Sequence, residues 1–404
     1  MKRVLLTVAL CVIASASFAQ KKAVSQAQNI AKGDKADYAE ARTLIQGALE
    51  NPETKDDAKT WFVAGYIEDQ QFSTERMKEM LGQQPNQPVM YQALLNALPY
   101  FEKSYELDQL PDAKGKIKPK HTKDIKGVLS ANHIQYFNAG AYYFDQRDYR
   151  KAYESFEKYL VISDHPMFKG EPVAARDSNF MIVQFYSGVA ATQLGEPQTA
   201  IAALNRAKET DYKGNEVYQY LFGEYQQLND SVNMEKVLIE GLQKFPEEKF
   251  YMLHLINIYI YSNRNEEAIQ YLQTAINDEP NNPQLYDVLG SIYESLKDVE
   301  KAEATFKKAL EIDPQYVDAL SNLGRLYYNQ AVTIQGDANM ISDNKLYQEE
   351  LAKAKALFEQ ARPFFEQARQ LKPEQTEYLV ALRGIYYNLN MGKEYDEIEA
   401  LLNK

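Results

Sequence analysis

The stretch 283–314, "PQLYDVLGSIYESLKDVEKAEATFKKALEIDP", places small and large residues at spacings that suit two helices packed side by side. Counted from Pro283, small residues stand at positions 8, 20 and 27, where they let two antiparallel helices approach closely. Large residues at positions 7, 11 and 24 fill the seam, and a proline at position 32 ends the second helix. The residues that carry this pattern are Leu289, Gly290, Tyr293, Ala302, Phe306, Ala309 and Pro314. The stretch therefore predicts an antiparallel helix pair.

The same pattern returns at intervals of 34 residues upstream of Pro283. The matching residues are Tyr259, Ala268, Leu272, Ala275 and Pro280, then Tyr225, Leu238, Gly241 and Pro246, then Gly188, Ala200, Leu204 and Ala207. Four consecutive units, 181–316, thus share one phase without a gap. A repeat of this length predicts a chain built of stacked helix pairs.

Outside this block the pattern survives but its spacing changes. An earlier unit contains Gly140, Tyr143, Ala152 and Phe156, and about 14 extra residues follow it. Two further units have their second halves displaced, by 20 residues between Gly65 and Phe101 and by 25 residues between Gly324 and Phe365. A last unit starts at Thr376. These offsets indicate insertions within repeats whose core pattern is kept.

In spacing and residue types the units resemble the tetratricopeptide repeat (TPR), and the resemblance covers nearly the whole mature chain. It implies an all-α fold, a right-handed α-α superhelix (TPR solenoid) of about seven or eight repeats. The chain looks like the TPR proteins of Gram-negative bacterial envelopes, which are exported, acidic and non-catalytic. Because TPR solenoids serve many processes, the resemblance indicates fold and class only.

Two segments with a shared pattern, "ALPYFEKSYEL" (97–107) and "ARPFFEQARQL" (361–371), carry a proline inside a strongly helical context. Both follow an insertion, so we expect two extended helical hairpins, around 70–95 and 330–360. Pro99 and Pro363 would then bend the second helix where it enters the repeat core. The alternative is that each proline starts a shorter helix after a loop, which the breaker-rich "LGQQPNQP" (81–88) favours for Pro99.

The domain organisation follows from these boundaries. We expect a cleaved signal peptide at 1–19, N-terminal capping helices at 20–56 and a TPR solenoid at 57–404. Within the solenoid the predicted units are 57–112 with an insertion, 133–164, 181–214, 215–248, 249–282, 283–316, 317–375 with an insertion, and the C-terminal cap 376–404.

The first residues have the pattern of a secretory signal. Lys2 and Arg3 precede an apolar run, 4–13, and Ser17-Phe18-Ala19 supplies a cleavage site. The run is too short to cross a bilayer, and a buried N-terminal helix is the other reading. We therefore expect export with cleavage after Ala19, to the periplasm or to the outside of the cell. The single cysteine, Cys11, lies in this segment, so the mature chain would have no disulfide and no cysteine-based metal site.

The charge balance limits the partners. Without Lys2 and Arg3, 43 basic residues stand against 57 acidic ones, a net charge of −14. This argues against nucleic acid and against general adhesion to anionic lipid. The segment "KGKIKPKHTK" (114–123) is an exception, with five lysines. It is either a docking patch for an acidic partner or a lipid phosphate, or a solvated linker between the first two repeats.

No motif of a known catalytic centre is present. The sequence has no P-loop, no G-x-S-x-G and no H-E-x-x-H, and the four histidines are scattered. The segment 337–350 superficially resembles a calcium loop but lacks its central glycine, so we expect a hairpin tip capped by Asp343 or Asn344. We predict no enzyme activity, no cofactor and no metal, although a perturbed carboxylate pair in a closed pocket would revive an enzyme.

The resemblance places a ligand groove on the concave face, at positions 2, 5, 6, 9, 12 and 13 of each repeat. The candidate partner-binding residues there are Asn138, Tyr186, Tyr220, His254, Asn257, Tyr261, Asn322, Arg325, Tyr328, Asn329, Tyr387 and Asn388. Tyr and Asn combine apolar surface with adaptable hydrogen bonds, which suits an extended peptide. The alternative for the tyrosines is packing between repeats. The lysines of the carboxylate clamp found in some TPR domains are absent at position 5.

These observations favour a scaffold or adaptor that binds other proteins or extended peptides through the groove and the hairpins. The alternative is a glycan-binding or small-ligand-binding module, with tyrosines as stacking platforms. The chain has 30 tyrosines but one tryptophan, the residue in which sugar sites are usually richer. The identity of the partner and the oligomeric state do not follow from the sequence.

Overall fold

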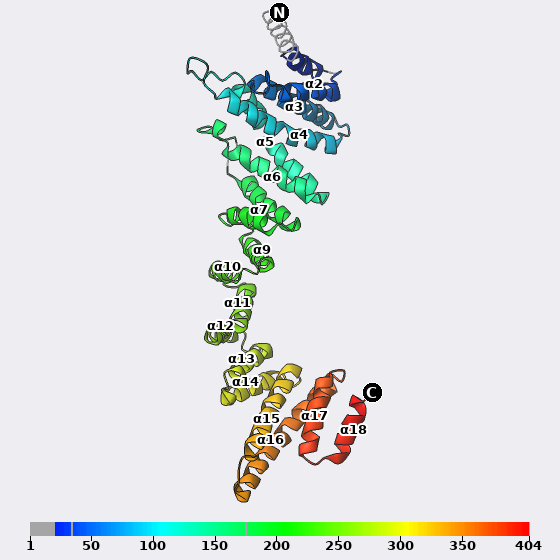
Figure 1. Cartoon of the computed structure of the whole chain (residues 1–404), viewed down its shortest axis with the longest axis vertical. Coiled ribbons are helices and arrows are strands. Elements are labelled where there is room, and N and C mark those ends of the chain that lie inside the picture. The colour runs from blue at the N-terminus through cyan, green and yellow to red at the C-terminus, as the bar shows by residue number, and fades with distance from the viewer. Residues whose placement is uncertain (1–20, 34, 174–175, 404) are drawn as a thin grey trace, which may run out of the picture. The chain divides into compact units, whose positions relative to one another are not determined.

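The computed structural model describes residues 21–33, 35–173 and 176–403, and within these ranges all regular structure is helical (Figure 1). Residues 21–30 are helical and precede the labelled helices. The helices are α2 (Tyr38–Glu50), α3 (Ala58–Met80), α4 (Gln87–Asp108), α5 (Thr122–Asp145), α6 (Tyr149–Asp164), α7 (Ser178–Gln193), α8 (Pro197–Ala207), α9 (Gly214–Gln227), α10 (Ser231–Lys244), α11 (Lys249–Tyr261), α12 (Asn265–Asp278), α13 (Pro283–Ser295), α14 (Val299–Ile312), α15 (Val317–Ala338), α16 (Asn344–Leu371), α17 (Thr376–Asn388) and α18 (Gly392–Leu402), with a short 3₁₀ turn η1 (Pro166–Phe168). The predicted all-α class is confirmed. The predicted signal peptide lies outside the described residues.

The chain divides into two compact units, one ending at Val237 and the other starting at Leu238, so that the boundary falls inside α10. In the first unit α3 packs on α4, α5 on α6 and α7 on α8. In the second unit the pairs are α11 with α12, α13 with α14, α15 with α16 and α17 with α18. Consecutive helices therefore form stacked antiparallel pairs in each unit, as the repeat predicts. The number of repeats and their limits stay predictions.

The turn between the two helices of a pair repeats in detail. The fifteenth residue of each predicted unit without a hairpin insertion, and of the C-terminal cap, has a positive φ. These residues are Arg147, Gly195, Asn229, Asn263, Lys297 and Asn390, in units that start at 133, 181, 215, 249, 283 and 376. In the units that carry a hairpin insertion, the residues seven positions after the position-8 glycine are Phe72 (after Gly65) and Ala331 (after Gly324), and they lie inside the long helices α3 and α15. The left-handed turn thus marks the repeat and is absent where the hairpins extend.

Backbone hydrogen bonds explain this turn. The N–H of position 16 donates to the carbonyl of position 11, as Asp298 does to Tyr293 at 2.9 Å and Asp148 to Tyr143 at 2.9 Å. This six-to-one bond closes the first helix and requires the left-handed residue between them. The carboxylate of Asp298 then accepts the Lys301 N–H at 3.2 Å and caps the second helix. One aspartate thereby ends one helix and starts the next.

The repeats with insertions keep the same close contact between their helices. A β-carbon on Gly65 would lie 2.7 Å from the ring of Phe101, and one on Gly324 would lie 3.0 Å from the ring of Phe365. Each pair consists of a position-8 glycine and its displaced position-24 aromatic residue. The inserted residues therefore lengthen the two helices without opening the seam at their base.

The two hairpins are formed by long continuous helices. Helices α3 and α4 have 23 and 22 residues, and α15 and α16 have 22 and 28. Figure 1 shows the end of the α15–α16 hairpin extending beyond α17 and α18. Pro99 and Pro363 lie inside α4 and α16, each on the exposed face. The alternative in which the prolines start shorter helices is wrong, whereas a bend at each proline stays a prediction.

Helix α5 begins earlier than the repeat pattern indicates. It starts at Thr122, well before the predicted unit boundary at 133, and buries Ile125 and Leu129 on its additional turns. The reason is a cap supplied by the preceding helix. The carboxylate of Asp108, the last residue of α4, accepts N–H bonds from Lys120, His121 and Thr122 at 2.8, 2.8 and 2.9 Å. The repeat spacing carries no sign of this contact.

Candidate functional site

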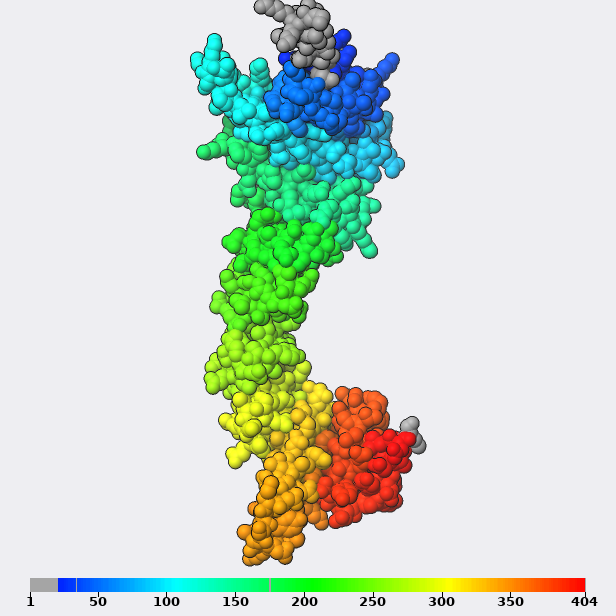
Figure 2. Space-filling view, viewed as in Figure 1, coloured from blue at the N-terminus to red at the C-terminus, as the bar shows by residue number. Residues whose placement is uncertain are grey.

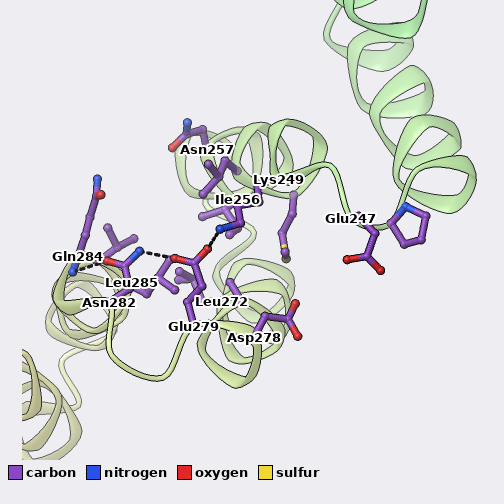
Figure 3. A pocket seen from close by; sticks show the side chains of 15 residues that line it. Glu247, Lys249, Ile256, Asn257, Leu272, Asp278, Glu279, Asn282, Gln284 and Leu285 are labelled. Atoms are coloured by element: carbon purple, nitrogen blue, oxygen red, sulfur yellow. Dashed lines mark hydrogen bonds and ion pairs between the residues drawn. The ribbon is translucent and has the colours of Figure 1, made fainter. Parts of the chain in front are cut away.

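A cavity of about 660 Å³ opens between α11, α12 and α13, within the unit that starts at Leu238 (Figure 3). About half of its lining residues are apolar, and the side chains come from all three helices. The apolar lining residues are Met252, Leu253 and Ile256 of α11, Leu272 and Ala275 of α12, and Leu285 and Val288 of α13. The cavity therefore lies at the seam between one helix pair and the first helix of the next.

Helix α11 has more apolar surface than its packing covers. Its sequence, "KFYMLHLINIYIY" (249–261), is apolar on nearly every face. Tyr251 and Leu255 are buried, but Leu253 remains 47% exposed and Tyr261 87% exposed. A helix that is apolar all round is ordinarily buried on all sides. Of the apolar residues that α11 contributes to the cavity, Leu253 is exposed, whereas Met252 and Ile256 are buried.

The rim of the cavity is acidic. Glu247, Asp278 and Glu279 line it together with one cation, Lys249 (Figure 3). Lys249 pairs with Glu279, and Asn282 Nδ2 also donates to Glu279 Oε2 at 2.8 Å. These two hydrogen bonds, that of Lys249 first, lower the pKa of Glu279. Within the part of the chain that the structure describes, Glu247 and Asp278 have no ion pair, so the rim has a net negative charge.

A chain of polar contacts joins α13 to α15 beside the cavity. Asn322 Nδ2 donates to Asp287 Oδ1 at 2.9 Å, and Arg325 Nη2 donates to Asn322 Oδ1 at 3.0 Å. The same guanidinium pairs with Glu294 at 2.8 Å. Burial raises the pKa of Asp287 to about 6, with Asp318 adding to the increase, whereas the Asn322 hydrogen bond and Arg325 oppose it. Asn322 and Arg325, two predicted groove residues, are therefore brought together in a contact between repeats.

The predicted tyrosines divide into packed and accessible ones. Tyr186 lies edge-on to Phe144 and Phe185, with ring centroids at 5.5 and 5.2 Å. Tyr220 contacts Phe185 at 6.2 Å, and Tyr328 lies edge-on to Phe358 at 5.5 Å. Three of the five groove tyrosines are thus engaged between helices, as the packing alternative proposes. Tyr261 and Tyr387, 87% and 71% exposed, remain accessible.

The other predicted residues occupy varied environments. His254 is half-buried with its ring centroid 4.3 Å from that of Phe250, and burial lowers its pKa. Asn257 is exposed and lines the cavity, and Asn329 is exposed on α15. Asn138 Nδ2 donates to Gln135 at 3.1 Å. Asn388 Nδ2 donates to the Gly384 carbonyl at 2.8 Å. Only Asn257 among the twelve lies in the α11–α13 cavity.

A second, shallower hollow lies beside α17 and α18. Tyr387, Asn388, Asn390 and Tyr395 line about 450 Å³, and the rings of Tyr387 and Tyr395 stand 6.1 Å apart. Asn388 and Asn390 also border an adjoining hollow of about 400 Å³ against α15 and α16. Within it Gln335 Nε2 donates to Asn388 Oδ1 at 2.9 Å. Aromatic rings and side-chain amides therefore dominate this region.

The predicted groove positions do not include most of the residues that line the α11–α13 cavity. Met252, Ile256 and Leu272 are ordinary core types at core positions, so repeat spacing does not distinguish them. The available signal was the all-round apolar sequence of α11.

At the predicted hairpin tip, Asp343 Oδ1 accepts the N–H groups of Lys345 and Leu346 at 2.9 and 3.0 Å, which confirms it as the cap of α16.

Within residues 21–33, 35–173 and 176–403, no three His, Cys, Asp or Glu side chains gather in a way that could hold a metal ion. Over the same residues, no helix combines the length and apolar character that a membrane crossing requires.

Comparison with known proteins identifies the repeat. Residues 290–330 match the family model described as TPR repeat. Among solved structures, YrrB, described as a TPR protein with an unusual peptide-binding site, is 18% identical, covers 50% of this chain and 92% of its own, with a TM-score of 0.35. A TPR repeats protein from Bacteroides fragilis is 20% identical over 67% of this chain and 98% of its own, with a TM-score of 0.32.

A further similar structure is the C-terminal part of a TPR repeat-containing protein from Cytophaga hutchinsonii, 16% identical over 65% of this chain and 92% of its own, with a TM-score of 0.43. No curated protein matches the sequence. The matched residues 290–330 lie in α13–α15. Other helix pairs have the same turns and glycine contacts at the corresponding positions of their sequence. The described part of the chain is all-α, and its residues 290–330 match the tetratricopeptide repeat.

Proposed function

We propose that the protein is an exported scaffold or adaptor that binds a segment of a partner protein through the α11–α13 cavity and the adjoining groove face. The observation that carries the proposal is the exposed side chain of Leu253 on α11, which lines the cavity together with the buried apolar residues Met252 and Ile256. Aliphatic walls with a polar rim are typical of sites that take up a side chain or a short peptide segment. TPR repeats are generally protein-interaction modules, which favours a protein ligand.

The acidic rim suggests the chemistry of that segment. Glu247 and Asp278 would attract a cationic group, while Leu253 and Ile256 would contact an aliphatic one. We therefore propose a segment that combines Lys or Arg with aliphatic residues. Tyr261, exposed at the end of α11, would extend the contact along the groove.

The remaining parts of the proposal come from the sequence. The signal pattern of residues 1–19 supports export to the periplasm, with release from the cell as the alternative. The absence of catalytic motifs and the general role of TPR repeats support a binding protein without enzyme activity and without a cofactor. The net charge of −12 supports a partner other than nucleic acid.

Site-specific photocrosslinking in the source cells tests the proposal. A photoreactive residue in place of Leu253 should capture a discrete partner, whereas one in place of Val161, a comparably exposed residue of α6, should not. Filling the cavity with Val288→Trp should abolish the crosslink at position 253 while the chain stays folded. The proposal fails if positions 253 and 161 capture the same proteins, or if the filled cavity crosslinks as before.

A glycan or small ligand is the second candidate, and the Tyr387–Tyr395 hollow favours it. Its two rings and neighbouring Asn388 and Asn390 supply stacking surfaces and amide hydrogen bonds. Tyr387→Ala should then abolish binding in a glycan screen, and Tyr261→Ala should not affect it. A screen in which no glycan distinguishes the Tyr387→Ala variant from the unmodified chain would exclude this candidate.

A further inference from the structure

The connection between α4 and α5 is rich in lysine, and we call it, together with the first two residues of α5, the lysine loop (residues 109–123). It stands out from the body of its unit (Figures 1 and 2, cyan). Every residue from Leu110 to Lys120 is exposed. The lysines are Lys114, Lys116, Lys118, Lys120 and Lys123.

The lysine loop is held in place at its base. Besides three N–H bonds, Asp108 accepts the hydroxyl of Thr122 at 2.8 Å. Burial alone would raise the pKa of Asp108, but the hydrogen bonds from Lys120, His121 and Thr122 lower it. The His121 ring stacks on Phe62 with centroids 4.7 Å apart. These contacts fix the point at which the chain leaves α4 and enters α5.

The tip of the lysine loop is also ordered by hydrogen bonds. Asp112 Oδ1 accepts the N–H groups of Lys114 and Lys116 at 2.9 and 3.0 Å. The Gly115 N–H donates to the Asp112 carbonyl at 2.8 Å, with Gly115 at a φ of +72°. The loop is therefore an exposed turn whose backbone is held by hydrogen bonds.

The cations of this turn are left largely without counterions. Lys118 approaches Asp112 at 3.5 Å. Lys114, Lys116, Lys120 and Lys123 form no ion pair within the described part of the chain, whereas lysines elsewhere, such as Lys301 with Asp298 at 2.7 Å, commonly do. Holding several uncompensated charges together has a repulsive cost, which an anionic ligand would remove.

The composition of the lysine loop separates two kinds of anionic ligand. All of its cations are lysines, a residue depleted from protein–protein interfaces, and it contains no arginine. Two aliphatic side chains of the loop face solvent: Leu110, four residues before Lys114, at 59% exposure, and Ile117, between Lys116 and Lys118, at 56%. Lysines among exposed aliphatic residues suit a bilayer surface, where ammonium groups meet phosphates and aliphatic groups enter the headgroup region.

We propose that the lysine loop docks the protein on a bilayer rich in anionic phospholipid. The chain has a net charge of −12, which argues against general adhesion to such a surface. A loop that stands out from its unit can bring its lysines to an anionic surface although the chain as a whole is acidic. Charge interactions are screened over about 8–10 Å at physiological salt, so acidic residues farther than this from a docked bilayer would repel it little. The proposal is independent of the partner site at α11–α13.

Vesicle cosedimentation tests the proposal with the purified full chain. The probes are phosphatidylcholine vesicles with and without one third of phosphatidylglycerol. The test variant replaces Lys114, Lys116, Lys118 and Lys120 by Gln. The control variant makes the same change in net charge at Lys308, Lys345, Lys353 and Lys393, exposed lysines of other helices. A third variant, Leu110→Ser with Ile117→Ser, keeps all the charges.

The unmodified chain should bind the anionic vesicles, bind neutral ones much less, and dissociate as salt is raised. The four-lysine variant should bind at least about tenfold more weakly, given the contribution of each lysine near an anionic surface. The control variant should retain binding, and the serine variant should bind more weakly than the unmodified chain. The proposal is overturned if the unmodified chain ignores anionic vesicles, or if the test and control variants lose binding equally. Binding to soluble polyglutamate without binding to vesicles would also overturn it, in favour of an acidic protein.

Discussion

The ring of Phe306 lies so close to the α-carbon of Gly290 that a β-carbon built there would stand 2.6 Å from Cδ1 and Cε1. Phe306 is fully buried in α14, and Gly290 belongs to the facing helix α13. Similar glycine contacts with a large side chain occur at Gly65, Gly188 and Gly324. The approach of the two helices in a repeat is thus set by a glycine opposite a large residue.

Gly290→Ala should destabilise the chain, because the added methyl group must displace a buried ring. Overpacking of this kind costs about 1–3 kcal/mol in the free energy of unfolding. Gly336→Ala is the matched control, since Gly336 lies in helix α15 with nothing within 4 Å of its built β-carbon. It should stabilise by about 0.5–1 kcal/mol through helix propensity. Urea denaturation of both variants measures the two changes, and equal effects would contradict the packing argument.

The left-handed turn gives a second prediction. Lys297 has a φ of 62°, a conformation that costs a residue with a β-carbon about 1–2 kcal/mol. Lys297→Gly removes this strain but makes the unfolded chain more flexible, so we expect a net stabilisation of about 0.5–1 kcal/mol. Lys297→Val should destabilise, because a β-branched residue tolerates the conformation poorly. Thermal unfolding of the two variants should shift in opposite directions, and a shift in the same direction would exclude the strain.

A third prediction concerns the buried carboxyl of Asp287, whose pKa rises from an ordinary 3.8 to about 6 in the folded chain. Between these values the folded state binds more protons than the unfolded state, so stability falls as the pH rises from about 4 to 6. Asp287→Asn keeps an acceptor for Asn322 and removes the titration. We expect the variant to be about 2 kcal/mol more stable at pH 7 and nearly equal to the unmodified chain at pH 4.

Urea midpoints measured at several pH values between 4 and 7 check this expectation. Asp337→Asn is the control, because Asp337 is an exposed residue of α15 that forms no ion pair within the described residues and does not act on Asp287. It should leave the pH dependence of stability nearly unchanged. If Asp287→Asn has the pH dependence of the unmodified chain, the buried carboxyl does not titrate in this range.

The sequence predicts the repeated part of this fold well because each repeat obeys local rules. Gly65 and Phe101 were matched across an insertion by position alone, and the structure brings them together. The capping of α5 by Asp108 was not predictable, since it depends on how one repeat follows another. The same holds for the contact of Asn322 with Asp287, which joins two repeats.

The spacing of the sequence also did not predict which of the groove tyrosines are accessible. Tyr261 and Tyr328 stand at neighbouring positions of their repeats, yet only Tyr328 is covered. The inserted hairpin lengthens α16 and places Phe358 beside Tyr328, whereas α11 ends at Tyr261 and leaves its ring in solvent. The predicted set of binding residues therefore contains both packing residues and candidates for contact with a partner.

This difference yields the last prediction. Tyr328→Ala should destabilise the chain by about 1–3 kcal/mol, because it removes a half-buried ring that contacts Phe358 and closely approaches Gly384. Tyr261→Ala should change stability by less than about 0.5 kcal/mol, as expected for an exposed residue. Arg325→Ala would leave Glu294 without its ion-pair partner, so this change also combines a structural and a binding effect.

Tyr261→Ala is consequently the variant whose effect on partner binding can be interpreted directly. Urea denaturation and partner crosslinking at position 253 should be measured on the same preparations. We expect Tyr261→Ala to weaken crosslinking without changing the urea midpoint, and Tyr328→Ala to lower the midpoint. If Tyr261→Ala lowers the midpoint as much as Tyr328→Ala does, its ring belongs to the core. If it changes neither quantity, the partner does not extend along the groove beyond the α11–α13 cavity.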